Sequence, residues 1–152
     1  MMDKTSKEIK TGRFIAIASV VFAILLIIHY FVSLDAATAK ALLELSNQNA
    51  TTHAADYILN NFRFTGIMYI LAYLAGIITI WNRHTYVWWF MFAVYLSNSL
   101  FTLINFSMTI KAIQHAHQTL LTFPIIIVVI GSLALAIYMV VVSIKYKSTF
   151  NR

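Results

Sequence analysis

Residues 14–34 form a long apolar run without one Asp, Glu, Lys or Arg side chain, and this run constrains the fold more than any other feature. A helix of about 20 apolar residues is long enough to cross the hydrocarbon core of a bilayer. Three further segments contain long apolar stretches. Of the whole chain, 61% is hydrophobic and 11% is charged, whereas soluble domains carry about 25% charged residues. The sequence therefore predicts an all-α integral membrane protein, a four-helix bundle.

The predicted helices span about 14–34, 54–82, 85–111 and 119–145, within one transmembrane domain that covers residues 1–152. The loop 35–53 should hold a short helix, because Asp35 can cap the Ala- and Leu-rich stretch that follows it. The alternative for the first helix is a cleaved signal peptide. Its apolar run is longer than the usual signal core of about 7–15 residues, which favours a membrane helix.

Basic residues are divided unequally between the two sets of helix ends. One set holds Lys4, Lys7, Lys10, Arg13, Arg83, Lys145, Lys147 and Arg152, and the other holds Lys40, Arg63 and Lys111. Cytoplasmic loops carry the excess of Lys and Arg. We therefore expect a multi-pass protein of the cell membrane with both termini in the cytoplasm and the loop 35–53 outside. No basic patch is interleaved with aromatic side chains, so the net charge of +6 does not indicate nucleic-acid binding.

Four polar side chains in the third predicted helix recur with helical spacing: Asn98, Thr102, Asn105 and Thr109. This spacing places them on one face. An asparagine that faced lipid would leave its amide without partners, so the face should turn inward. We expect Asn98, Thr102 and Asn105 to act as a helix-packing stripe. The alternative is that the stripe lines a polar cavity or a partner-binding surface.

Further polar side chains lie near the predicted outer ends of the helices. In a compact bundle they would ring one outer polar pocket, lined by His29, Tyr30, Asp56, Asn60, Arg63, Tyr69, Asn105, Thr109, His115 and His117. An arginine so close to hydrocarbon normally needs an acceptor, which makes Arg63 the first residue to test.

Histidines raise the alternative of a redox protein. His29, His53, His115 and His117 all fall on the predicted outer side, and imidazoles can bind transition metals or haem. However, the chain has no H-E-x-x-H or C-x-x-C motif, and it has no cysteine. The sequence therefore favours a protein without a cofactor.

None of the five carboxylates lies in an apolar run. Ion-coupled transport usually needs an ionisable group at membrane depth, so a small transporter component remains only an alternative. Catalytic motifs are also missing, which argues against an enzyme. The sequence favours a protein that acts by contact within the lipid bilayer, as a complex subunit, a regulator or an immunity-type protein. Its partner would be another membrane protein or a second copy of itself.

Overall fold

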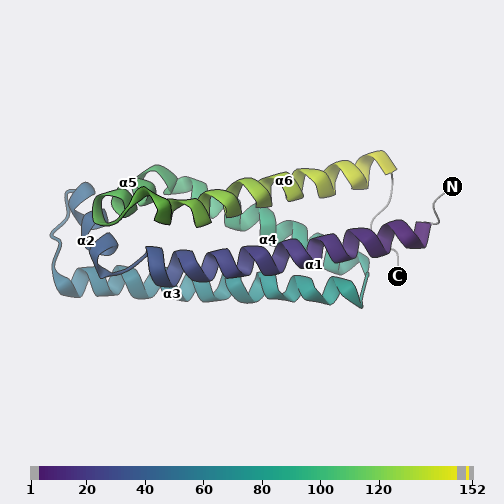
Figure 1. Cartoon of the computed structure of the whole chain (residues 1–152), viewed down its shortest axis with the longest axis horizontal. Coiled ribbons are helices and arrows are strands. Elements are labelled where there is room, and N and C mark those ends of the chain that lie inside the picture. The colour runs from purple at the N-terminus through teal and green to yellow at the C-terminus, as the bar shows by residue number, and fades with distance from the viewer. Residues whose placement is uncertain (1–3, 147–149, 151–152) are drawn as a thin grey trace.

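The computed structural model describes residues 4–146 and Phe150, and this part of the chain is all-α (Figure 1). The first half comprises α1 (Lys4–Ile28), a π-helical turn η1 (His29–Ser33), α2 (Ala36–Leu45), α3 (Thr52–Leu74) and a 3-10 segment η2 (Ala75–Ile80). The second half comprises α4 (Thr85–Ile104), α5 (Phe106–Ala116), a 3-10 turn η3 (Thr119–Thr122) and α6 (Phe123–Tyr146). The basic residues Lys147 and Arg152 lie outside the described residues.

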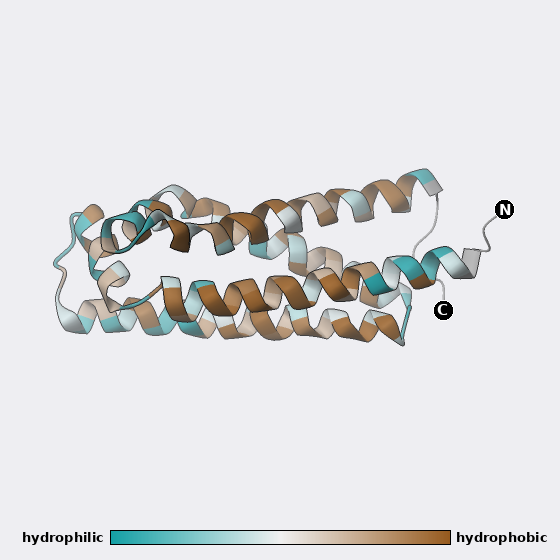
Figure 2. Ribbon diagram, viewed as in Figure 1, coloured by the Kyte–Doolittle hydropathy of each residue, from teal (hydrophilic) through white to brown (hydrophobic). Residues whose placement is uncertain are grey.

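Four helical segments are long and apolar enough to cross a membrane: Ser6–Ser33, Thr52–Ile80, Thr85–Ile104 and Thr119–Lys145. Figure 2 shows that hydrophobic residues dominate the middle of the bundle and hydrophilic residues gather towards its two ends. Many large apolar side chains point outward, among them Ile17, Ile130 and Ile144. Outward apolar side chains suit a lipid surrounding. The prediction of a multi-pass helical membrane protein is thus confirmed.

The order long helix, short helix, long helix occurs twice along the chain, as α1–α2–α3 and as α4–α5–α6. Helix α1 packs against α3 and α6, and α4 packs against α6 and α3. The pairs α1/α4 and α3/α6 therefore lie across the diagonals of the bundle. The short helices α2 and α5 pack together at one end, which we call the loop end (Figure 1). The start of α1 and the end of α6 lie at the other end, which we call the terminal end.

The predicted continuous helix 85–111 is wrong. Helix α4 ends at Ile104, Asn105 leaves the helical conformation with φ −109° and ψ 11°, and α5 begins at Phe106. Asparagine has a lower intrinsic helix propensity than the leucine and isoleucine residues before it, which is compatible with a break at this position. The break lets α5 turn onto α2, and the helical structure continues to Ala116, through residues that the sequence suggested were a loop.

The predicted short helix is present as α2. Asp35 caps it, with Oδ1 accepting a hydrogen bond of 2.9 Å from the backbone N–H of Thr38. At the terminal end, the buried Phe150 ring lies 5.1 Å from the Trp88 ring, and the Thr85 hydroxyl donates to the Phe150 carbonyl.

Glycines allow α1 to approach η2 closely. A Cβ on Gly12 would lie 2.6 Å from the Thr79 carbonyl oxygen, and a Cβ on Gly76 would lie 2.3 Å from Ser19 Oγ. The Thr79 hydroxyl donates a hydrogen bond of 2.8 Å to the Gly12 carbonyl across the same contact. Close backbone approach through small residues is typical of membrane helix pairs, since no hydrophobic force drives helices together in lipid.

Candidate interaction groove between α3 and α4

A buried polar network joins all four long helices near the centre of the bundle. The hydroxyl of Tyr95 on α4 lies 2.7 Å from Ser19 Oγ on α1, and the hydroxyl of Tyr73 on α3 lies 2.6 Å from Ser132 Oγ on α6. Asn98 Nδ2 donates to the Tyr73 hydroxyl at 3.0 Å. Each tyrosine thus reaches across a diagonal of the bundle. The hydrocarbon core of a bilayer offers no hydrogen-bonding partner, so these bonds satisfy hydroxyl groups that would otherwise remain unpaired there.

Three aromatic rings fill the space around this network. The Phe22 ring contacts Tyr73 and Tyr95 edge-on, with ring centroids 5.9 Å and 6.2 Å apart, and the two tyrosine rings are 5.6 Å apart. Edge-to-face aromatic packing adds to the energy of burial. The centre is occupied by side chains, so the accessible hollows lie at the seams between helices.

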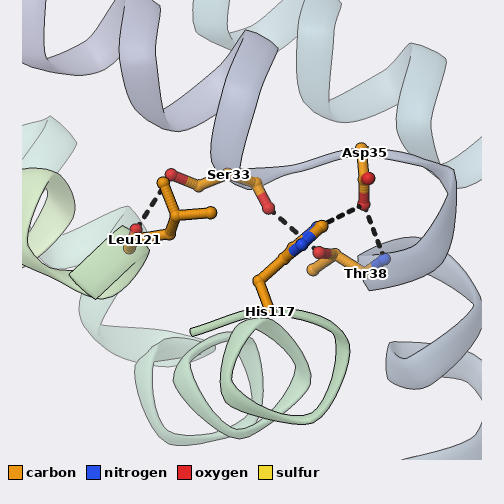
Figure 3. Close-up of polar contacts among 5 residues, drawn as sticks. All are labelled: Ser33, Asp35, Thr38, His117 and Leu121. Atoms are coloured by element: carbon orange, nitrogen blue, oxygen red, sulfur yellow. Dashed lines mark hydrogen bonds and ion pairs between the residues drawn. The ribbon is translucent and has the colours of Figure 1, made fainter. Parts of the chain in front are cut away.

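A second set of polar contacts ties the two halves of the chain together at the loop end (Figure 3). Ser33 Oγ donates to the Leu121 carbonyl at 2.9 Å, and Thr38 Oγ1 donates to the Ser33 carbonyl at 2.9 Å. His117 Nε2 lies 3.0 Å from Asp35 Oδ1. These contacts hold the start of α2 against the turn between α5 and α6.

Asp35 is the carboxylate of this cluster. Partial burial raises the pKa of the Asp35 carboxyl, but the Thr38 backbone N–H and the neighbouring His117 more than offset that effect. The pKa of Asp35 is therefore lower than the ordinary aspartate value, and the charged form is the stable one in this position.

One hollow lies in the seam between α3 and α4, and a second adjoins it at the loop end, between α2, α3, α5 and the end of α4; both have Thr65 in their walls. We call them together the α3/α4 groove. The hollow in the apolar part of the seam has a volume of about 520 Å³, and its walls include Tyr69, Ala72, Ala93 and Ser97. The hollow at the loop end has a volume of about 380 Å³, and its walls include Gln48, Asn61, Phe62, Phe101, Asn105, Met108 and Thr109.

The two parts of the α3/α4 groove differ in chemistry. Small and aromatic side chains dominate the part within the apolar seam, whereas amides gather at the loop end. Asn61 and Asn105 are exposed, and within residues 4–146 their side chains make no hydrogen bond. The α3/α4 groove therefore offers an apolar slot with unused hydrogen-bonding groups at one end.

Two residues of the predicted outer polar pocket, Asn105 and Thr109, line the same hollow, and Tyr69 lines the adjoining one. Tyr69, Asn105 and Thr109 line the α3/α4 groove, and the Tyr69 ring lies 6.1 Å from the Phe101 ring. The other members lie elsewhere. His29 and Tyr30 are buried, and Asp56, Asn60 and His115 are exposed.

Arg63 and His117 take individual partners. Arg63 is half-buried, with its guanidinium carbon 5.9 Å from the centre of the Phe31 ring, a distance at which a cation is attracted to an aromatic face. His117 faces Asp35. His53 is exposed at the start of α3. In the part of the chain that the structure describes, no three His, Cys, Asp or Glu side chains are grouped closely enough to hold a metal ion.

The predicted packing stripe divides at the helix break. Asn98 is fully buried, and Thr102 is half-buried with its hydroxyl donating to the Asn98 carbonyl at 2.8 Å. The prediction that Asn105 turns inward is wrong, because α4 ends one residue earlier and Asn105 is exposed.

Two buried tyrosines of the polar network, Tyr73 and Tyr95, were not among the predicted site residues. Tyr73 and Tyr95 both lie deep within apolar segments rather than at their ends. A phenol far from the membrane interface needs a polar partner. The central position of both tyrosines in apolar segments was therefore the signal in the sequence, although that position could not identify Ser19 and Ser132 as their partners.

Comparison of the chain with protein-family models, with curated proteins and with solved structures found no match.

Proposed function

We propose that this protein acts by contact within the membrane and docks a transmembrane helix of another protein lengthwise in the α3/α4 groove. It would serve as a subunit, regulator or immunity-type partner of that protein. The observation that carries the proposal is the α3/α4 groove itself, which opens along an apolar seam and ends among amides that make no hydrogen bond within residues 4–146.

The walls of the α3/α4 groove suit a helix as the occupant. Ala72 on α3 and Ala93 on α4 have small side chains, so another helix backbone can approach the seam closely. Thr65 and Ser97 add small polar groups. Small residues and hydroxyls are enriched where membrane helices pack against each other.

The loop end of the α3/α4 groove suits the polar flank of such a helix. Asn61 and Asn105 supply donors and acceptors that no other described side chain uses. A helix whose apolar stretch ends in polar residues would pair with them, and hydrogen bonds in a partly apolar site are stronger than in water.

The unequal distribution of basic residues supports a proposed orientation. Lys7, Lys10, Arg13, Arg83 and Lys145 lie at the terminal end, and Lys40, Arg63 and Lys111 lie towards the loop end. Both termini would then be cytoplasmic and the polar end of the α3/α4 groove would face outward.

Site-specific photocrosslinking in native membranes tests the proposed docking. A photoreactive residue at Ala93, which is exposed in the α3/α4 groove, should join the chain to a peptide from a membrane-spanning segment of another protein, identified by mass spectrometry. The same residue at Ile137, which is 63% exposed on α6, is the matched control and should give lipid adducts only.

A blocking variant sharpens the result. With the photoreactive residue at Met68 in the same groove, Ala93→Trp should abolish the protein adduct, and Ile130→Trp on the α6 surface should leave it intact. Lipid adducts alone at both groove positions, or equal adducts at Ile137, would contradict the proposal. An adduct between two copies of this chain would show that the α3/α4 groove binds a second copy of the chain rather than another protein.

A further inference from the structure

A third hollow lies on the side of the bundle opposite the α3/α4 seam, between α1 and α6. Its volume is about 680 Å³, and its walls run from Lys10 and Thr11 past Phe14 and Tyr138 to Phe22 and Gly131. We call it the α1/α6 slot. The Phe14 and Tyr138 rings meet edge-on across it, with centroids 6.4 Å apart, and both rings are more than two-fifths exposed.

The two ends of the α1/α6 slot differ in polarity. At the terminal end, Lys10 offers an exposed ammonium group, and within residues 4–146 the hydroxyls of Thr11 and Tyr138 make no hydrogen bond. At the deep end, the Phe22 ring lies against Gly131, where a Cβ would come within 2.5 Å of it. The α1/α6 slot is thus charged at its mouth and apolar at its floor.

The charge at the mouth extends beyond Lys10. Lys7 and Arg13 precede and follow it by three residues, so all three lie on neighbouring positions of one helical surface, and both are exposed. Among the described residues, Glu8 is the one carboxylate at the terminal end. The mouth is therefore positively charged.

The length of the α1/α6 slot fits one membrane leaflet. At about 1.5 Å rise per residue, Lys10 and Phe22 are roughly 18 Å apart along α1, and half of a hydrocarbon core of about 30 Å is about 15 Å. We infer that the α1/α6 slot binds one anionic phospholipid, with its phosphate at Lys10, Thr11 and Tyr138 and one acyl chain lying along Phe14 to Phe22.

Selectivity would come from the headgroup rather than the acyl chain. Lipid tails are as apolar as the slot, so moving a chain from bilayer to slot gains little hydrophobic energy. Lysines near a membrane surface favour anionic over zwitterionic lipids. The inference does not depend on the α3/α4 groove, which lies at the other seam of the bundle.

Native mass spectrometry of the full chain, purified in mild detergent with equal amounts of phosphatidylglycerol and phosphatidylcholine of the same acyl chains, tests the inference. The parent should retain one phosphatidylglycerol with a preference of about fivefold or more. Lys10→Gln should remove most of that preference, and Lys40→Gln, an exposed lysine at the loop end, should not change it.

Two tryptophan variants separate the slot from general surface charge. Ala134→Trp fills the α1/α6 slot at an exposed position and should abolish retention, whereas Ile137→Trp on the neighbouring lipid-facing surface should not. Ala93→Trp fills the α3/α4 groove and should leave lipid retention unchanged, so failure of the docking proposal is distinguishable from failure of this one. No headgroup preference in the parent, an equal loss with Lys40→Gln, or a lipid-free dimer would each overturn the inference.

Discussion

Asn98 lies within α4 and Asn105 directly follows its last residue, and these two identical side chains occupy opposite environments. Asn98 is fully buried and donates to Tyr73, whereas Asn105 is exposed at the end of α4. Asn98→Leu should therefore lower the free energy of unfolding by about 0.5–2 kcal/mol, the worth of a hydrogen bond between membrane helices. Asn105→Leu should change it by less than about 0.5 kcal/mol, as surface substitutions do. Thermal unfolding of both variants in one detergent checks this, and equal losses would refute it.

The free energy of unfolding should depend on pH through Asp35. Its folded pKa is lower than its unfolded value, so the cap contributes stability above the unfolded pKa of about 3.9 and loses it as the pH falls through the folded value. In a His117→Gln background, where only the carboxyl titrates at this contact, Asp35→Ala should cost about 0.5–2 kcal/mol at pH 7. That cost should stay constant down to about pH 5 and shrink below about pH 4. Unfolding measured across this range would disprove the linkage if the cost rose on acidification.

The sequence could predict at this scale that Asn98 needs partners, because an amide in an apolar run has few alternatives. It could not predict that Arg63 would lie over Phe31 or that His117 would face Asp35. The first contact depends on how η1 packs against α3, and the second depends on how the start of α2 meets the turn after α5. Residues so far apart in sequence leave no local pattern.

At the scale of elements, the contact between α1 and η2 depends on Gly12. A Cβ at Gly12 would meet a backbone carbonyl, which cannot move aside. A Cβ at Gly131 would meet the far end of the Phe22 ring, which borders the α1/α6 slot and has room to shift towards it. Alanine gains up to about 1 kcal/mol of helix propensity at either site. Overpacking costs about 1–3 kcal/mol where neighbours cannot move. Gly12→Ala should therefore be the less stable variant.

Denaturation of the two alanine variants in the same detergent provides the comparison. Far-ultraviolet circular dichroism should show unchanged helix content for both, so that any difference reflects packing. If Gly131→Ala were the more damaging change, the Gly12 contact would not limit how closely α1 and η2 approach.

The four long helices could be predicted from length and hydropathy alone, because the bilayer fixes how many apolar residues a span needs. The division of residues 85–116 into α4 and α5 could not. Residues 105–111 are as compatible with a continuing helix as with a new one, and the packing of α5 on α2 decides between them. That contact joins segments about 70 residues apart, which a local sequence pattern does not report.

At the scale of the whole molecule, the proposed orientation is open to a direct test. Basic residues concentrate at the terminal end, so alkaline phosphatase fused after Arg152 should be inactive and a fluorescent protein that matures only in the cytoplasm should be bright. The same reporters placed in the connection between α2 and α3, at Asn49, should give the reverse result. Matching activity at both positions would contradict the three crossings expected between them, by the spans Thr52–Ile80, Thr85–Ile104 and Thr119–Lys145.

The diagonal tyrosine–serine links also set an order on biosynthesis. The chain is inserted from its N-terminus, so Tyr73 has no serine partner until α6, the last helix, has entered the membrane. A nascent chain that stops before α4 leaves the Tyr73 hydroxyl without its contacts to Asn98 and Ser132, and an unsatisfied polar group in hydrocarbon destabilises such a fragment. Residues 1–84 made alone should therefore be degraded faster in a pulse-chase experiment than the same fragment co-expressed with residues 85–152, and Tyr73→Phe should narrow that difference. The same links that hold the finished bundle would thus report whether its synthesis is complete.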